Sequence, residues 1–378
     1  MKNATRLLVL AAATLLIAAS CGGATVTPSP TPTVTVTATP TTVPTVLTVG
    51  AIHVGSIKDA GYNQAQHEGL VAMTQKVPGI KLLEAENVPE GPDVERVMEN
   101  MIQQGATLIF PQSFGYMDFA LNVAAKHPEV KFEHPAGYKL ADNFGTYWAA
   151  SDQLSYALGV AAGKMTKSNK LAFVGAMPIP TVLASVNAFH LGAQSVNPSV
   201  ETRAVFTGTW SDPAKEAAAT NAVVDQGVDV VTMLVDSPIT VVQTAEKRGA
   251  YSIGYHSKAV AEFAPKGWIS GVNFDWGNYF AQMAIDVIKG TWKAQNYIGP
   301  LSTSMANLAP FGANVTSAAK DATLLAISRF QTGALASPYL GPVYDQDGTL
   351  RIKDGEVPPA YFVNQVDWFA KGIIGQPK

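Results

Sequence analysis

The sequence has few of the residues that mark several common protein classes. Cys21 is the single cysteine among 378 residues, so an intrachain disulfide is excluded. Charged residues make up 15% of the chain, and 26 Lys and Arg against 29 Asp and Glu leave a formal charge of −3. This balance excludes the basic surface that nucleic-acid binding requires. The hydrophobic share of 47% is enough for a large core, and the length suggests more than one domain.

Catalytic and metal-binding motifs are also missing. The stretch GVAAGKMTK, from Gly159 to Lys167, has the wrong spacing for a phosphate loop, and Met165 stands where Ser or Thr would hold magnesium. His67 in HEGLV has no second histidine for a zinc motif. We find no G-x-S-x-G elbow and no dinucleotide glycine fingerprint. The sequence therefore predicts neither an enzyme nor a metal or cofactor site.

The N-terminus has the pattern of a bacterial secretory signal. Lys2 and Arg6 precede an apolar run from Leu7, and small residues lead to Cys21. We predict a signal peptide over 1–20 and lipidation of Cys21, although Ala18 stands where a lipobox usually has leucine. The alternative is a signal-anchor helix that stays in the membrane, but the apolar run is short for a span of about 20 residues.

Residues 21–46 are rich in Thr, Pro and Val, as in TVTPSPTPTVTVTATP. Such a segment has too little apolar area for a core, so we predict an extended tether. The folded part would then stand at the outer face of the cytoplasmic membrane, held only by the lipid.

From Leu47 onward, short β-branched runs alternate with amphipathic helical windows. VLTVGAIHV, ATLIFP, KLAFVGAM and VDVVTMLV are typical of buried strands, and PDVERVMENMIQQG and DPAKEAAATNAVVDQG of helices. The alternation restarts near residue 149, which predicts an α/β fold of two doubly wound parallel-sheet lobes joined by a hinge. We place the first lobe at 47–148 and 275–300, and the second at 149–274 and 301–378.

Ligands of open parallel sheets bind beyond the carboxyl ends of the strands. Aromatic, acidic and amide side chains gather at these ends, with few cations. They are His53, Lys58, Asp59, Tyr62, Asn63, Ser113, Phe114, Gly115, Tyr116, Asp118, Trp210, Asp212, Asp236, Ser237, His256, Lys258, Asn273, Asp275 and Trp276. A flat ring with a polar edge suits such surroundings, because aromatic faces stack and polar groups fix the edge.

Several of these residues have simpler interpretations. Asp212 before Pro213 is typical of a helix N-cap, and Asp59 of a cap or turn. Asp236 could cap a helix that begins near Pro238, and Asp118 could be a solvated helix residue. Tyr62 and Trp210 could be hydrophobic cover at a lobe edge. His67 could be a hydrogen-bonded core histidine.

Several blocks in order resemble the basic membrane protein family, the substrate-binding lipoproteins of ABC importers whose best-understood members bind purine nucleosides. GSIKDAGYNQAQHEGL is similar to the family's G-x-I-x-D-x-x-F-N pattern, and QQGATLIFPQSFGYMD, TWSDPAKEAAA, YSIGYHSK and GPVYDQDG to later blocks. The resemblance runs from about Val49 to the C-terminus. It implies the type I periplasmic binding protein fold, a cleft lined by the strand-end residues, permease subunits as partners and a monomer.

Position by position, the resemblance places the family's two ring-stacking aromatics on Tyr62 and Trp210. The family's base-reading carboxylate falls on His53, its ribose-binding aspartate near His256 and its ribose-contacting lysine near Asn273. All three are departures from the family, and the loss of the ribose-binding acid and lysine favours a free base over a nucleoside. The subgroup resembled implies adenine. Asp236 would then accept from the exocyclic amine, while His53 or Asn273 serves a ring nitrogen. The remaining residues expected at the ligand are Asn63, Ser113, Phe114, Gly115 and Trp276.

Other functions stay open on the sequence. The same scaffold could hold another flat ligand such as riboflavin, although a larger ring system needs a wider cleft. A surface receptor or adhesin is a further alternative, and an extracellular hydrolase would need a nucleophile and base that we do not find.

Overall fold

The computed structural model describes residues 46–378. The predicted signal peptide, Cys21 and all but the last residue of the predicted tether lie outside the described residues. In the described part of the chain, no helix is both long and apolar enough to pass through a membrane.

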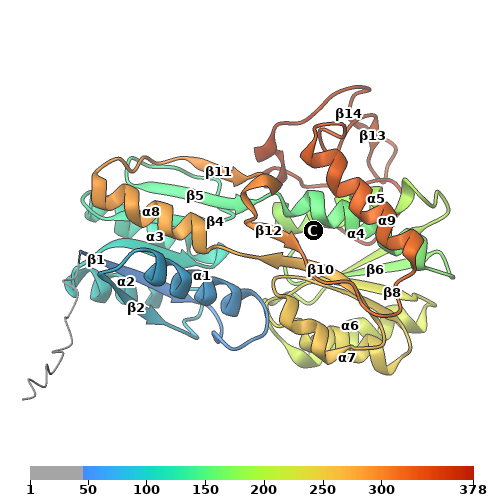
Figure 1. Cartoon of the computed structure of the whole chain (residues 1–378), viewed down its shortest axis with the longest axis horizontal. Coiled ribbons are helices and arrows are strands. Elements are labelled where there is room, and N and C mark those ends of the chain that lie inside the picture. Colours follow the sequence, from blue (N-terminus) through green and yellow to red (C-terminus); the bar gives the residue numbers. More distant parts are fainter. Residues whose placement is uncertain (1–45) are drawn as a thin grey trace, which may run out of the picture. The chain divides into compact units, whose positions relative to one another are not determined.

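The first sheet has six parallel strands in the order β11-β5-β4-β3-β1-β2. Its strands are β1 (Leu47–His53), β2 (Ile80–Ala85), β3 (Ala106–Gln112), β4 (Lys131–Pro135), β5 (Phe144–Ala149) and β11 (Asn296–Gly299). Helices cover both faces (Figure 1). Helices α1 (Tyr62–Lys76) and α8 (Gly277–Lys289) share one core with Val49 and Phe110, and α2 (Asp93–Gln103) and α3 (Met117–Lys126) share another with Ile52 and Ile109.

The second sheet has seven strands in the order β12-β10-β9-β8-β6-β7-β15. They are β6 (Lys170–Gly175), β7 (Glu201–Phe206), β8 (Val230–Leu234), β9 (Tyr251–Gly254), β10 (Trp268–Phe274), β12 (Ala306–Leu308) and β15 (Ile373–Ile374). All pairs are parallel except β10 with β12. Helices α4 (Ser151–Met165) and α5 (Pro180–Gln194) cover one face, and α6 (Pro213–Asp225) and α7 (Ile239–Lys247) the other.

The C-terminal residues add elements to the second half. Helix α9 (Ser317–Gln331) packs on α4, and β13 (Val343–Tyr344) and β14 (Leu350–Ile352) form a small antiparallel sheet. Four short 3-10 helices complete the described residues: η1 (Phe114–Tyr116), η2 (Lys258–Phe263), η3 (Leu301–Thr303) and η4 (Ala360–Asn364).

The sequence explains why both sheets are buried. Alternate residues of the central strands face opposite helical layers, so β1 and β8 are apolar on both sides, and every residue of β8 is buried. Continuous apolar runs of this kind are the mark of parallel strands covered by helices on both faces. The predicted α/β fold with two doubly wound lobes is confirmed.

The chain passes between the two sheets three times. The passages lie between β5 and α4, between β10 and α8, and between β11 and β12. The lobe boundaries predicted from the sequence put the crossings at 148/149, 274/275 and 300/301. Hinges between lobes consist of a few loop or element-terminal residues, and these three crossings are connections of that kind.

The glycines of GVAAGKMTK lie inside α4 and serve helix packing. A methyl group on Gly159 would lie 1.9 Å from the backbone oxygen of Phe189, and one on Gly192 of α5 would lie 1.9 Å from that of Tyr156. The two helices therefore approach each other through glycine, and the phosphate-loop pattern has a purely structural explanation.

Candidate functional site

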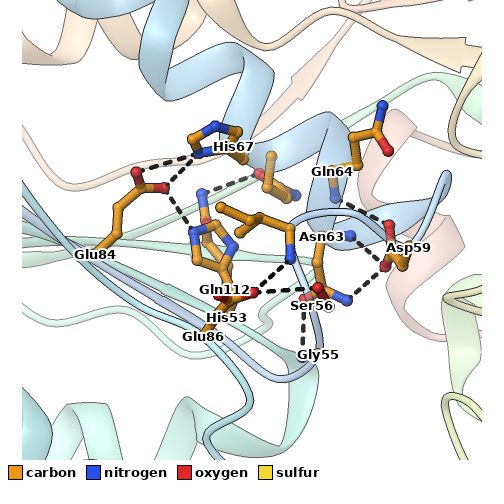
Figure 2. A network of polar contacts seen from close by, with 12 residues as sticks. His53, Gly55, Ser56, Asp59, Asn63, Gln64, His67, Glu84, Glu86 and Gln112 are labelled. Carbon is orange, nitrogen blue, oxygen red and sulfur yellow. Dashed lines mark hydrogen bonds and ion pairs between the residues drawn. The ribbon is translucent and has the colours of Figure 1, made fainter.

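The loop after β1 is built around one aspartate. The Asp59 carboxylate accepts hydrogen bonds from the backbone N–H groups of Gly61 (2.8 Å), Asn63 (3.0 Å) and Gln64 (3.1 Å), and from the Asn63 side chain (2.8 Å). Asn63 Oδ1 in turn accepts from the N–H of Gly55. Figure 2 shows both residues turned into this loop. Asp59 thus acts as the cap of α1, and the loop sets the position of Tyr62 as the first residue of the helix.

This loop meets the second half of the molecule. The N–H of Tyr62 donates to the backbone oxygen of Asp236 at 2.9 Å, and the Ser237 hydroxyl donates to the backbone oxygen of Asp59 at 3.3 Å. A methyl group on Gly61 would lie 1.8 Å from the same Asp236 oxygen, so glycine is needed for this approach. The loops after β1 and β8 therefore touch through their main chains.

A cavity of about 400 Å³, measured with the space at its mouth, lies where these loops meet. Residues from strand ends of both sheets line it: Tyr62, Ser113, Phe114, Ala136, Trp148, Ile179, Thr181, Val182, Trp210, Leu234, Asp236 and His256. Ligand cavities for small molecules are lined mostly by apolar side chains with a few polar groups. This cavity has that composition.

Four aromatic rings contribute to the lining, and they come from both halves. Tyr62, Phe114 and Trp148 belong to the first half and Trp210 to the second. Trp148 donates its indole N–H to Ser151 Oγ at 3.2 Å, which anchors that ring at the start of α4. Aromatic walls of this kind favour a flat guest that can stack.

Asp236 is the acidic group of the cavity. Its side chain is buried, and burial, together with the nearby carboxylates of Asp59 and Glu90, raises its pKa well above the usual value. The N-cap position of helix α7 is occupied by Pro238 and not by Asp236. A buried carboxyl group with a raised pKa in a cavity is suited to pairing with a polar ligand.

His256 is the second buried ionisable group of the lining after Asp236. Neither ring nitrogen has a hydrogen-bond partner among the described residues, and burial lowers its pKa to about 3. Its backbone has a φ of 74°, which is unusual for a residue other than glycine. Local strain and an unpaired buried ring are typical of binding sites, because a ligand can supply the missing hydrogen bond.

The structure brings six of the predicted site residues together in the cavity lining. These are Tyr62, Ser113, Phe114, Trp210, Asp236 and His256. The five others, His53, Asn63, Gly115, Asn273 and Trp276, are not among the lining residues. Direct ligand contact by those five stays a prediction.

Each of the five has partners of its own. Buried His53 hydrogen-bonds Glu84 through Nε2 at 2.9 Å, and the same carboxylate pairs with His67 (Figure 2). Asn273 Oδ1 accepts from the N–H of Lys258 at 2.9 Å. Buried Trp276 stacks on Phe274 with ring centroids 4.7 Å apart.

The structure also bears on the simpler interpretations of Asp212, Asp118 and His67 as a helix cap, a solvated residue and a core histidine. Asp212 caps α6 by accepting from the N–H groups of Ala214 and Lys215, which confirms the N-cap prediction. Asp118 is exposed and pairs with Lys139 at 2.7 Å. His67 is partly exposed and bonded to Glu84, so it is not a core histidine.

The sequence reading missed six lining residues, Ala136, Trp148, Ile179, Thr181, Val182 and Leu234. Ala136, Ile179 and Thr181 follow strand ends and the strand-end rule could have found them. Trp148 and Leu234 are the next-to-last residue of β5 and the last residue of β8, and their apolar side chains are typical of buried strand positions, so no local signal marks them as cavity wall.

Metal ligation is not supported by the side-chain arrangement. Within residues 46–378, no three His, Cys, Asp or Glu side chains are grouped so that they could hold an ion.

Comparison with known proteins gives the following similarities. Residues 46–315 match the model of the Bmp family, described as "ABC transporter substrate-binding protein PnrA-like". A purine-binding protein of Brucella abortus is 38% identical over 331 residues, which cover 86% of this chain and 93% of the relative. A putative ABC transporter glucose-binding protein of Haloferax volcanii is 31% identical over 270 residues, 71% of this chain and 68% of that protein.

A solved structure supports the fold. A solute-binding protein of an ABC transporter system from Conexibacter woesei superposes with a TM-score of 0.60 at 21% identity, covering 76% of this chain and 97% of that one.

Proposed function

Because the chain belongs to the PnrA-like family of ABC transporter substrate-binding proteins, we propose that it captures a purine base, adenine first, between its two lobes and delivers it to a permease. The observation that carries this proposal is an aromatic cavity with two buried ionisable side chains in its lining: His256, whose ring nitrogens have no hydrogen-bond partner among the described residues, and Asp236, whose pKa is raised by burial. The purine-binding relative from Brucella abortus supports the ligand class.

The charge of the cavity favours a neutral guest. No lysine or arginine is among the lining residues, while Asp236 lies in the wall with Asp59 and Glu90 nearby. A phosphate group would be placed beside carboxylates without a cation to pair with, which costs free energy. A base or nucleoside is therefore favoured over a nucleotide.

The hydrogen-bond pattern favours adenine among the bases. A raised pKa favours the protonated carboxyl form of Asp236, which presents one donor and one acceptor. Adenine offers the matching pair on two edges, where its exocyclic amine donor lies beside the acceptor N1 or N7, whereas guanine offers two acceptors on its N7 and O6 edge and a matching pair only at N1–H and O6. Neutral His256 supplies one further donor or acceptor nitrogen to the base.

Stacking supplies the remaining affinity. Tyr62 from the first lobe and Trp210 from the second are the aromatic residues that we assign to the two faces of the base. Replacing an aromatic side chain on which a base stacks with alanine costs about 1–3 kcal/mol of binding free energy. Because the two rings come from different lobes, the ligand favours the closed arrangement over an open one.

The working site stands outside the cytoplasm. Cys21 carries the lipid, and the Thr- and Pro-rich segment links it to the folded part. Metabolic labelling with a fatty acid tests this: the wild type takes up label and Cys21→Ala does not. Equal labelling of both would contradict the anchor.

A thermal-shift panel tests the ligand. We expect adenine to raise the unfolding temperature, since a ligand at 100 times its Kd adds about 2.7 kcal/mol to stability. Adenosine, guanine, riboflavin and glucose serve as comparators. A shift with riboflavin or glucose and none with any purine would overturn the ligand assignment, and a neighbouring gene pair for a permease and an ATPase would support the transport role.

A further inference from the structure

Glu90 connects the two halves at the mouth of the cavity. It lies in the loop between β2 and α2, and its Oε1 accepts three hydrogen bonds, from Ser113 Oγ (2.6 Å), the N–H of Gly115 (2.8 Å) and Trp210 Nε1 (2.9 Å). Ser113 and Gly115 follow β3 of the first sheet, whereas Trp210 follows β7 of the second. One carboxylate oxygen therefore holds groups from both halves, and two of them line the cavity.

The surrounding chain leaves room for this carboxylate. A methyl group on Gly115 would lie 2.3–2.6 Å from the three atoms of the Glu90 carboxyl group, so alanine at this position would displace the Glu90 side chain. The Tyr116 hydroxyl donates to the backbone oxygen of Val88, two residues before Glu90, and so fixes the loop that carries it.

The chemistry of the bond makes it dependent on closure. An indole N–H is a donor only, and a carboxylate acceptor makes the hydrogen bond stronger than a neutral one would be. The bond needs the two halves together, so it stabilises the closed state alone. It also fixes the rotation of the Trp210 ring, which sets the angle of the face toward the cavity.

We infer that Glu90 is a positioning residue that stabilises the closed arrangement of the two lobes and orients Trp210 against the bound base. The hydrogen bond between Glu90 and Trp210 is called the latch below. The inference rests on the proposed function, since the guest is the purine base. Glu90 itself is outside the cavity lining and acts through Trp210 and Ser113.

The loop offers a matched control. Glu86 precedes Glu90 by four residues and also accepts two hydrogen bonds, from Ser56 Oγ (3.2 Å) and the N–H of Ile57 (3.1 Å). Both donors belong to the same half as Glu86. Glu86→Ala thus removes a second exposed carboxylate from the same loop without touching a contact between the halves.

Stopped-flow release of adenine tests the latch. We expect Glu90→Ala to raise the dissociation rate about 10-fold with little change in the association rate, and Glu86→Ala to change neither by more than about twofold. Gly115→Ala, which displaces the carboxylate but keeps its charge, should also accelerate release. Unchanged release from both Glu90→Ala and Gly115→Ala would overturn the inference.

A double-mutant cycle separates a latch from a general weakening. Trp210→Phe keeps a ring and removes the N–H, so Glu90→Ala added to it should cost little more. Fully additive effects on the dissociation rate would contradict the inference.

A readout without ligand separates this inference from the proposed function. The chain has six tryptophans, so ¹⁵N NMR gives an indole signal for each, and Trp210→Phe identifies the one of interest. We expect Glu90→Ala to shift that signal and Glu86→Ala to leave it in place. A signal that does not move contradicts the latch. A signal that moves in a protein that binds no purine contradicts the proposed function and leaves the latch standing.

Discussion

At the scale of single residues, the cavity depends on two buried ionisable side chains, Asp236 and His256, which are 4% and 1% exposed. Neither ring nitrogen of His256 has a hydrogen-bond partner among the described residues, and leaving such a group unpaired costs roughly 1–3 kcal/mol. A protein that only needed stability would have apolar side chains there. The cost is offset when a ligand with complementary polar atoms binds, which is why these two positions carry the proposal.

Substitution of Asp236 distinguishes its protonated form from its charged form. Asparagine also presents one donor and one acceptor, so Asp236→Asn should keep adenine binding within about 10-fold. Asp236→Ala should lose about 1–3 kcal/mol of binding free energy, because the base edge is then left unpaired. Isothermal titration calorimetry measures both. Loss of binding in the asparagine variant as large as in the alanine variant would show that the charge, and not the donor–acceptor pair, is needed.

Glu133 makes stability depend on pH. It is fully buried, accepts from Tyr279 (2.8 Å) and Trp292 (2.8 Å), and burial raises its pKa to about 7 from 4.5 despite these hydrogen bonds. The folded state therefore holds the proton more tightly than the unfolded state. The protonated carboxyl group therefore contributes fully to the free energy of unfolding below pH 4.5. This contribution, up to about 3 kcal/mol, is lost as the pH rises through 7.

Urea unfolding of Glu133→Gln measures this contribution. Between pH 4.5 and 7, the free energy of unfolding of the wild type should fall relative to that of the variant. Glu129→Gln, an exposed neighbour, is the control and should run parallel to the wild type. Parallel curves for the wild type and Glu133→Gln would contradict the pKa assignment.

At the scale of elements, α4 and α5 approach each other more closely than side chains would allow. Alanine is favoured over glycine in a helix by about 1 kcal/mol, so propensity alone would stabilise Gly192→Ala. The close approach to Tyr156 should reverse the sign and destabilise by roughly 1–3 kcal/mol. Denaturant unfolding measures the change, with Ser328→Ala at an exposed position of α9 as the control, expected within about 0.5 kcal/mol of the wild type. A Gly192→Ala protein more stable than the wild type would contradict the explanation by close helix packing.

Most elements could be predicted from the sequence because they are specified locally. The runs that form β1, β3, β6 and β8 are apolar and β-branched, and their helices end at glycine or proline. The C-terminal strands could not be predicted. β12 and β15 have three and two residues and exist only as edges of a sheet formed by distant parts of the chain.

The same limit applies to the site. Tyr62, Ser113 and Asp236 follow strands, so the rule for parallel sheets finds them. His53 also follows that rule, yet its ring bonds Glu84 from the neighbouring strand, a partner that its own segment does not reveal. Glu90 was not found because its role comes from Trp210, 120 residues away along the chain.

At the scale of the whole folded part, binding depends on two halves meeting. Residues 46–378 belong to one compact unit, and main-chain contacts join the loops after β1 and β8. A methyl group at Gly61 would lie 1.8 Å from the Asp236 oxygen there. An added methyl group at this contact between the loops after β1 and β8, which we call the seam, should therefore hold the two halves apart.

Gly61→Ala should weaken adenine binding about 10-fold or more, equivalent to about 1.4 kcal/mol, and should raise the radius of gyration of the ligand-bound protein. Calorimetry and small-angle X-ray scattering measure the two effects. Gly91→Ala is the control, since no atom lies within 4 Å of the added methyl group. Equal affinity and equal size in both variants would show that the seam does not govern closure.

The proposed adenine site can be tested by a crystal structure of the protein with adenine. We expect the base to lie in the cavity, with Tyr62 and Trp210 on its two faces and Asp236 at its amine edge. Adenine bound elsewhere, or a cavity filled by a sugar with both rings turned away, would contradict it.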